Sequence, residues 1–521
     1  MKNLFNYVMR LVAVVLGVGI VATSCGEPER KEILKVYNWG DYIDEDLLDE
    51  FEVWYYEQTG EKVEIVYQTF DINEVMLAKI EKGEADFDVV CPSEYIIERM
   101  MRNNLLQPIV NDEFLADLES TGTENYLDCV SPYLKRQFDH IITPDPKLNA
   151  NDYSVGYMWG TTGILFNTAY VTAEEAMSWD LMFDERLEGK ILVKDAFRDV
   201  YSPMLVYATT LELREEGVLG ADETLPLNDA AAAERSLEGK VPTIESLMYD
   251  ASDGSIAHVE EYLKRMKRLV AGWEADFGKE MMTQNKAWIN LMWSGDAVWA
   301  IEEAAAVGVS LDYVVPEEGS VVWFDGWVIP KYAKNARAAR YFINYMCAPE
   351  NAVRNMDATG YVSVVATEEV LRAMDPMLAA MDETEDEAEI AALQAERNAL
   401  LESEGVDLSY FFKDAEGNPL TFDMGNGYMV DASCVYVDPI MYPDKGVIAR
   451  CAMMHDSGAQ TEKMLEMWSR VKGDNLSPWM LAFIILSFTI IVVWIVWRKI
   501  DAYRKQQKML KRHHHARKQQ K

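Results

Sequence analysis

The most constraining feature of this sequence is a regular alternation of predicted strands and helices that begins at residue 33. Short apolar runs predict strands at 33–38, 63–67 and 87–91. Helices are predicted after them at 44–58, 72–81 and 94–103. Asp44 can cap the first helix and Gly60 can end it. Such a rhythm favours a parallel sheet with ligand sites at the carboxyl ends of its strands.

The alternation continues further along the chain, with one interruption. It predicts a strand at 191–194, helices at 202–214 and 256–274, and a strand at 297–301. Residues 374–405 differ, because they are rich in Ala and Glu and strongly acidic. Their helix propensity predicts an inserted, solvent-facing helix or helical hairpin. Contact with a permease is the functional alternative, but a solvated helix is the simpler interpretation.

Two segments predict attachment to a membrane. Residues 1–24 combine Lys2 and Arg10 with a short apolar run and small residues before Cys25. This pattern indicates a lipoprotein-type signal peptide with lipidation at Cys25, the alternative being an uncleaved anchor. Residues 476–497 carry no charge and are long enough to span a bilayer.

The basic tail at 498–521 sets the predicted orientation. It holds ten Lys or Arg residues and one acid, so the positive-inside rule places it in the cytoplasm. The body of the chain is then expected outside the bacterial inner membrane, on the periplasmic side. The triple histidine 513–515 within this tail is interpreted as solvated rather than metal-binding.

Charge and motif content exclude several classes of function. The net charge of −38 argues against nucleic-acid partners and favours cationic ligands, although acidity also serves solubility. The three histidines of the body, His140, His258 and His455, lie far apart, and there is no HExxH, GxSxG or P-loop motif. No cysteine pair has zinc-ligand spacing. The sequence does not decide whether two of the cysteines form a disulfide. We therefore predict no enzyme activity, metal or cofactor.

Aromatic residues and acids occur together at several predicted strand ends. The clusters are YNWGDY at 37–42, CPSEY at 91–95, DAFRD at 195–199, MWSGD at 292–296 and WFDGW at 323–327. A protonated alkyl polyamine needs a carboxylate for each ammonium, and aromatic faces add cation–π attraction and walls for its methylenes. A single cluster is most simply core packing, but their joint occurrence indicates a polyamine site.

These clusters resemble those of the spermidine/putrescine-binding proteins, a family of the type 2 periplasmic binding class. The matching strings are YNWGDYI, CPSEY, GYMWGTTGI, KDAFRD, MWSGDAVW, PEEGSVVWFDGWVIPK and ATGY. The resemblance implies an α/β fold of two lobes joined by hinge strands and closing on ligand. One lobe is expected from 33–155 with 325–370, and the other from 156–324 with 406–472.

The resemblance also implies which residues bind the ligand. They are Trp39, Asp41, Tyr42, Ser93, Tyr95, Asp195, Asp199, Trp293, Trp323, Asp325 and Tyr361. We expect Asp325 and Asp199 to hold one end of the polyamine and Asp41 with Tyr42 the other. Ala196 stands where spermidine binders often have an acid, so the choice between putrescine, spermidine and longer amines is open.

The function implied is that of the solute-binding component of an ABC importer, which delivers polyamines to permease subunits in the inner membrane. The alternative is a polyamine-sensing receptor body that signals through a partner, because the tail has no room for a kinase domain. An enzyme acting on polyamines is a third class, without a visible catalytic constellation.

Overall fold

The computed structural model describes residues 29–83, 86–226, 241–275, 277–425, 427–473, 486–490, 494 and 496–499. The chain divides into two compact units, 1–461 and 462–521. All the described strands lie in the first unit, and helix α20 (Thr461–Gly473) begins at its end.

The first part of the sheet is parallel, as the alternation predicts. Strand β1 (Ile33–Trp39) pairs with β2 (Glu64–Phe70) on one side and with β3 (Val89–Val90) on the other. Helices α2 (Asp46–Thr59), α3 (Asn73–Glu81) and α4 (Glu94–Arg102) follow these strands. Helix α2 buries residues with helical spacing, Leu47, Leu48, Phe51 and Tyr55. It ends at Gly60, whose φ of 72° is readily adopted only by glycine.

A second parallel part is centred on β6 (Ile191–Lys194). This strand pairs with β7 (Val270–Glu274) and with β8 (Ile289–Trp293). Helices α8 (Phe197–Glu215), α11 (Asp253–Lys267), α12 (Gly278–Thr283) and α13 (Ser294–Ala306) connect or follow these strands. The carboxyl ends of β6 and β8 therefore lead directly into α8 and α13.

Two predictions for this part are wrong. The helix predicted at 256–274 ends at Lys267, and its last residues form β7 instead. The run at 297–301 is not a strand but lies within α13, where Ala297, Val298 and Ala300 face the core. A short apolar run is compatible with either a helix or a strand. Here residues 270–274 and 289–293 are the strands, because they pair with β6.

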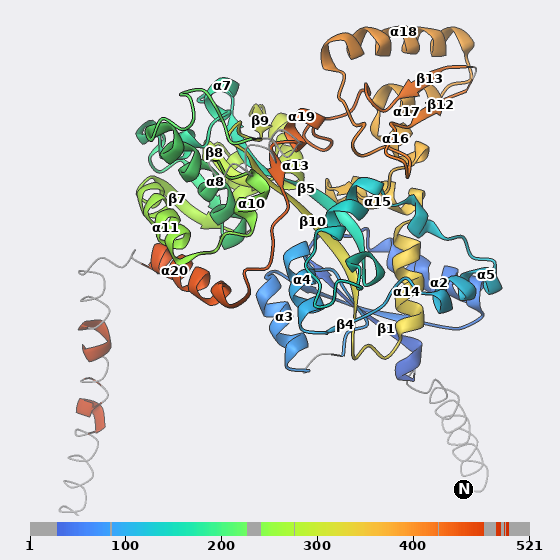
Figure 1. The fold of residues 1–521 in the computed structure, drawn as a ribbon, viewed down its shortest axis with the longest axis horizontal. Coiled ribbons are helices and arrows are strands. Elements are labelled where there is room, and N and C mark those ends of the chain that lie inside the picture. The colour runs from blue at the N-terminus through green and yellow to red at the C-terminus, as the bar shows by residue number, and fades with distance from the viewer. Residues whose placement is uncertain are drawn as a thin grey trace, which may run out of the picture. The chain divides into compact units, whose positions relative to one another are not determined.

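Two long strands join the two parts. Strands β5 (Ser154–Asn167) and β10 (Ser320–Pro330) are antiparallel and buried along their whole length. The second half of β5 pairs with β8, whereas β10 continues to β3 through Val328. Figure 1 shows both strands running between the two parallel parts. This arrangement confirms the predicted α/β fold with two lobes.

The remaining elements complete these layers. They are β4 (Leu106–Gln107), α5 (Asp112–Thr121), α6 (Pro132–Asp139), α7 (Ala173–Ala176), α10 (Ile244–Met248), β9 (Leu311–Val314), α14 (Ala336–Met346), α15 (Pro349–Thr359), β11 (Val362–Ser363), α19 (Lys445–Ile448) and β14 (Cys451–Ala452). Short 3-10 helices cover 30–32, 126–129, 150–152, 179–183, 185–187 and 458–460. Strands β4, β9, β11 and β14 all pair with β5 or β10, so these two organise the whole core.

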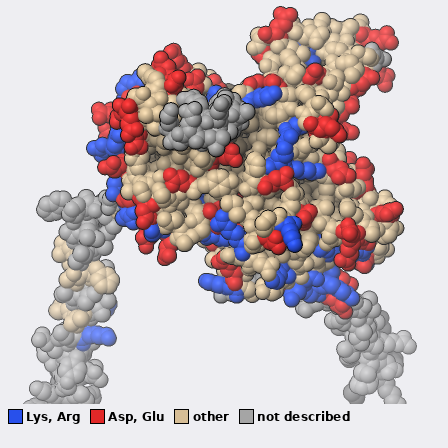
Figure 2. Space-filling view, viewed as in Figure 1, with Lys and Arg blue, Asp and Glu red and all other residues tan. Residues whose placement is uncertain are grey.

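The acidic segment lies in a helical layer of its own, drawn in orange in Figure 1. Helices α16 (Glu368–Met374), α17 (Pro376–Asp382) and α18 (Glu387–Glu404) follow one another, and the hairpin of β12 (Thr421–Asp423) and β13 (Met429–Asp431) comes next. Arg397 is the buried residue of α18. Figure 2 shows many acidic side chains on the surface of this part.

The segments predicted to attach the protein to a membrane lie largely outside the residues that the structure describes. Residues 1–24 with Cys25, and most of 476–497 and of 498–521, are not among the described residues. Within the described ranges, the structure contains no helix with the length and apolar character needed to cross a bilayer.

Candidate functional site

The predicted acid–aromatic clusters converge where the two parallel parts meet the long strands. The end of β1, the start of α4, the start of α8, the β8–α13 junction and the middle of β10 each supply residues. An acid in the first turn of a helix is stabilised by the helix dipole. Glu94, Asp199 and Asp296 occupy such positions in α4, α8 and α13.

Asp325 lies at the centre of this site. The register of β10 against β5 shifts between Asp325 and Gly326, which changes the direction in which the Asp325 side chain points. Its carboxylate accepts hydrogen bonds from the Tyr42 hydroxyl at 2.9 Å and from the Ser93 hydroxyl at 2.6 Å. Burial raises the pKa of Asp325 to about 7, and the negative charge of Asp199 adds to this shift.

Asp199 is a second buried carboxylate, held by an indole. Trp293 Nε1 donates to Asp199 Oδ1 at 2.9 Å. Burial raises the pKa of Asp199 to about 6, although the hydrogen bond from Trp293 opposes the shift.

Tyr42 does not lie as expected. Because Tyr42 bonds to Asp325 itself, the prediction that Tyr42 and Asp325 hold opposite ends of a ligand is wrong. Tyr42 is hydrogen-bonded to Asp325, and Trp293 to Asp199. The charge of Asp199 also acts on Asp325, so the expectation that these two acids hold one end of the ligand stays a prediction. The chain brings residues 42 and 325 together because β1 and β10 both flank β3, a pairing that local sequence does not encode.

Glu94 is a functional candidate that we did not predict. It is fully buried, and its Oε2 accepts a hydrogen bond from the backbone N–H of Phe324 at 3.0 Å. Burial raises the pKa of Glu94 well above its ordinary value, and the charges of Asp325 and Asp199 raise it further. The signal in the sequence was its place inside the CPSEY cluster, between Ser93 and Tyr95.

Aromatic rings surround the carboxylates. Tyr361 packs edge-on against Tyr42 and Trp323, with ring centroids 5.1 and 5.5 Å apart. Gly160 makes room for Trp323, since a Cβ at Gly160 would lie 2.6 Å from that ring. Trp39 packs instead against Phe70, at 4.5 Å.

Asn73 extends the hydrogen-bond network and was also missed. Its amide Nδ2 donates to the hydroxyls of Ser93 at 3.0 Å and Tyr95 at 2.8 Å. The Arg198 guanidinium lies over the Tyr95 ring, 4.4 Å from its centroid. These contacts hold Ser93 in place against Asp325 and fix the position of the Tyr95 ring.

Asp41 and Asp195 are the two predicted site residues that the structure leaves on the surface. Both side chains are exposed, and Asp41 adopts a left-handed φ of 51° in the turn after β1. The structure does not bring either one into the buried group of acids. Adjacent positions in a tight turn point in different directions, so cluster membership alone could not separate Asp41 from Tyr42.

Several buried polar atoms of the site have no hydrogen-bond partner within the part of the chain that the structure describes. They are Glu94 Oε1, Asn73 Oδ1, Trp39 Nε1 and Trp323 Nε1. Buried acceptors of this kind are costly unless a donor reaches them. Glu94 and Asn73 thus offer oxygens suited to a ligand that donates hydrogen bonds.

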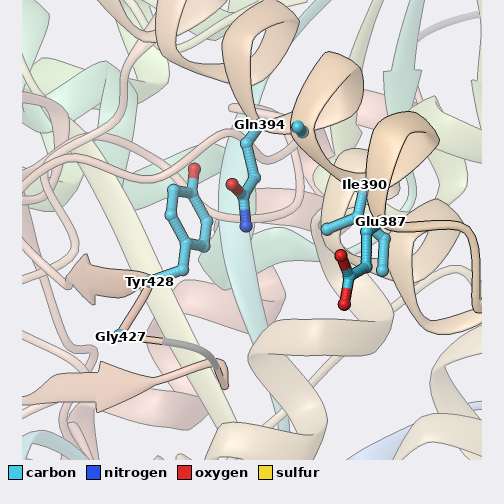
Figure 3. Close-up of a pocket in the computed structure, with 6 residues that line it drawn as sticks. Glu387, Ile390, Gln394, Gly427 and Tyr428 are labelled. Carbon is cyan, nitrogen blue, oxygen red and sulfur yellow. The ribbon is translucent and has the colours of Figure 1, made fainter.

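A pocket elsewhere does not fit this chemistry. A hollow of about 410 Å³ lies between α18 and the loop before β13, lined by Glu387, Ile390, Ala391, Gln394, Gly427 and Tyr428. Figure 3 shows the side chain of Gln394 beside Tyr428, with Ile390 and Glu387 on the same helix as Gln394. Only one acid lines it and no aromatic box encloses it, so we assign the candidate site to the buried acids instead.

Fold and site together define a two-lobed protein that holds a small solute rather than converting it. Residues 46–380 match the model of the bacterial extracellular solute-binding protein family. This chain belongs to that family. Membership confirms the prediction of a binding protein rather than an enzyme.

Comparison with curated proteins confirms the predicted resemblance. The spermidine/putrescine-binding periplasmic protein of Escherichia coli is 25% identical over 362 residues, covering 69% of this chain and 84% of that protein. The putrescine-binding periplasmic protein PotF of the same organism is 28% identical over 353 residues, covering 66% and 81%.

Solved structures agree on the fold. A putative spermidine/putrescine ABC transporter protein from Listeria monocytogenes matches with a TM-score of 0.55 and 26% identity, covering 85% of this chain and 99% of that one. The TpPotD lipoprotein of Treponema pallidum, at 18% identity and a TM-score of 0.53, supports the fold alone and covers 84% and 99%.

Proposed function

We propose that this protein binds a linear polyamine of the spermidine/putrescine class and passes it to the permease of an ABC importer on the periplasmic side of the membrane. The observation that carries the proposal is a group of three buried carboxylates, Asp325, Asp199 and Glu94. Among the described residues none of the three forms an ion pair. The charges of Asp325 and Asp199 raise the pKa of Glu94, and the charge of Asp199 raises the pKa of Asp325. The named binding proteins of Escherichia coli support the ligand class.

The contacts suggest how such a ligand lies. One ammonium binds Asp325 beside the hydroxyls of Tyr42 and Ser93, and another binds Asp199 beside Trp293. Rings such as Trp323 and Tyr361 pack against the methylenes between them, with Tyr95 and Trp39 farther out. Asp41 and Asp195, on the surface, attract the cation toward the site.

Lobe movement accompanies binding in this proposal. The lobes are 33–155 with 325–370 and 156–324 with 406–472, and β5 and β10 act as the hinge between them. Closure buries the ammonium–carboxylate pairs, which strengthens their hydrogen bonds by removing competing water. The closed form is the one delivered to the permease.

We also propose that the protein is tethered to the inner membrane by residues 476–497 and by a lipid on Cys25. The uncharged run and the basic tail after it support this. Deleting 476–521 alone, or exchanging 1–25 for a cleavable signal peptide without a lipidated Cys, should each leave the chain in washed membranes, whereas the combined variant should be released. Retention of the combined variant would show that another part of the chain holds it at the membrane.

The direct test is calorimetric titration of the purified full-length chain with putrescine, spermidine and spermine, with free lysine as the control. Lysine has two amino groups but also a carboxylate, which the buried acids should repel. We expect saturable binding of at least one polyamine and none of lysine. The absence of heat with all three polyamines would contradict the proposed function.

A further inference from the structure

Lys194 is a buried cation beside the candidate site. It is the last residue of β6 and is only 1% exposed. Its ammonium lies 2.6 Å from Asp296 Oδ2 and 3.5 Å from Glu274 Oε1, and it donates to the carbonyl of Ala275 at 3.1 Å. A strand end with a fully buried lysine is uncommon, because lysine is rarely buried without a partner.

The surroundings of Lys194 are those of a ligand ammonium. Its Nζ lies 4.3 Å from the centroid of the Trp293 ring, whose indole N–H bonds to Asp199. The other oxygen of Asp296 accepts a hydrogen bond from Tyr361 at 2.9 Å. A carboxylate and an aromatic face are the two groups that an alkyl ammonium requires.

In the ion pair, Lys194 is protonated and Asp296 is ionised. Burial alone would lower the pKa of Lys194, but Asp296 and Glu274 raise it. Burial alone would raise the pKa of Asp296, but Lys194 and Lys279 lower it. Lys279 lies 3.6 Å from Asp296 Oδ1. Asp296 is therefore already paired with two cations of the protein, whereas Asp325 and Asp199 form no ion pair among the described residues, although the charge of Lys194 lowers the pKa of Asp199.

We infer that Lys194 occupies one cation position of the polyamine site and restricts the ligand to two ammonium groups. This inference rests on the proposed function. The lysine side chain is a four-carbon stem with one ammonium, which resembles a diamine such as putrescine without its second ammonium. Asp325 and Asp199 then pair with the two ligand ammonium groups, and a third ammonium at the position of Lys194 would meet a like charge beside Asp296, a carboxylate that is already paired. The site therefore selects diamines such as putrescine over triamines such as spermidine.

The experiment compares the affinity for putrescine and spermidine in the parent and in two neutral variants, Lys194→Met and Lys194→Gln. Glutamine can still donate a hydrogen bond to Asp296, which protects the fold if methionine does not. We expect the parent to bind putrescine more tightly. Each folded neutral variant should move the ratio of the two dissociation constants toward spermidine by roughly tenfold or more.

Two lysine variants serve as controls. Lys194→Arg keeps the charge and should retain the preference for putrescine. Lys190→Met removes a lysine whose Nζ lies over the Trp288 ring at 5.1 Å, in the turn before the same strand, and should leave the ratio unchanged. Melting temperatures of all variants report whether each is folded.

The outcomes separate the inference from the proposed function. If the parent binds neither amine, the proposed function fails. If the parent binds polyamines but prefers spermidine, or if both neutral variants keep the parent ratio, only the role of Lys194 is overturned. A shift of equal size in Lys194→Arg would also overturn it, because the effect would then come from side-chain shape.

Discussion

The site and the acidic insertion bury carboxylates in opposite ways. In the insertion, Asp375 is fully buried, accepts a hydrogen bond at 2.8 Å from Arg397 Nε and forms an ion pair with that guanidinium, which is itself 2% exposed. In the site, Asp325 is also buried but is bonded to hydroxyl groups rather than to a cation. A buried carboxylate with its own cation holds the structure together. A group of them without one is arranged for a cation from outside.

The largest effect expected from this comparison is on ligand binding. Replacing Asp325→Asn leaves a bound ammonium without its carboxylate, which should weaken polyamine binding by about 3–5 kcal/mol in a calorimetric titration. Glu318→Gln is a matched control, since Glu318 is also buried and bonded to a serine hydroxyl, that of Ser178. If both variants bind polyamine like the parent, Asp325 is not part of the site.

The reverse effect is expected in the insertion. Arg397→Met leaves Asp375 buried without its partner and should lower the free energy of unfolding by about 3–5 kcal/mol. Polyamine affinity at a temperature where the variant is folded should not change. Chemical denaturation measures the free energy of unfolding, and titration of the same sample measures the polyamine affinity. A loss of binding free energy as large as the loss of unfolding free energy would contradict the distinction between the two regions.

A smaller effect concerns pH. Asp325 and Asp199 have folded pKa values of about 7 and about 6, above those of an unfolded chain, so the folded protein binds more protons between pH 4 and 7. Their contribution to the stability of the ligand-free protein therefore falls as pH rises through this window, by at most about 1.4 kcal/mol per pH unit for each group.

Denaturation of the ligand-free protein at pH 5, 6 and 7 measures this slope. Asp325→Asn should reduce it, because the variant lacks one of the two titrating groups. Saturating polyamine should reduce it as well, since a bound ammonium favours the charged carboxylate. An identical slope in parent and variant would show that Asp325 does not titrate in this range.

Local structure and several site residues were predictable because the signals are local. Gly60 ends α2 where a left-handed residue is required, and Asp44 Oδ1 accepts the hydrogen bond of the Asp46 N–H at the start of the same helix. Asp325 could be predicted from the WFDGW cluster, since acids between aromatics are unusual in a buried strand. The strand at 270–274 could not be predicted, because this segment is a strand only through its pairing with β6.

By itself the sequence determined the α/β alternation, the solute-binding class and most of the residues that gather at the site. Only the tertiary structure decided how these residues are grouped. It places Tyr42 on Asp325, moves Asp41 to the surface and buries Glu94. It also sets Lys194 against Asp296, 102 positions away in sequence. The reason is that burial and charge pairing depend on contacts between distant segments, whereas propensity and turn signals act within a few residues.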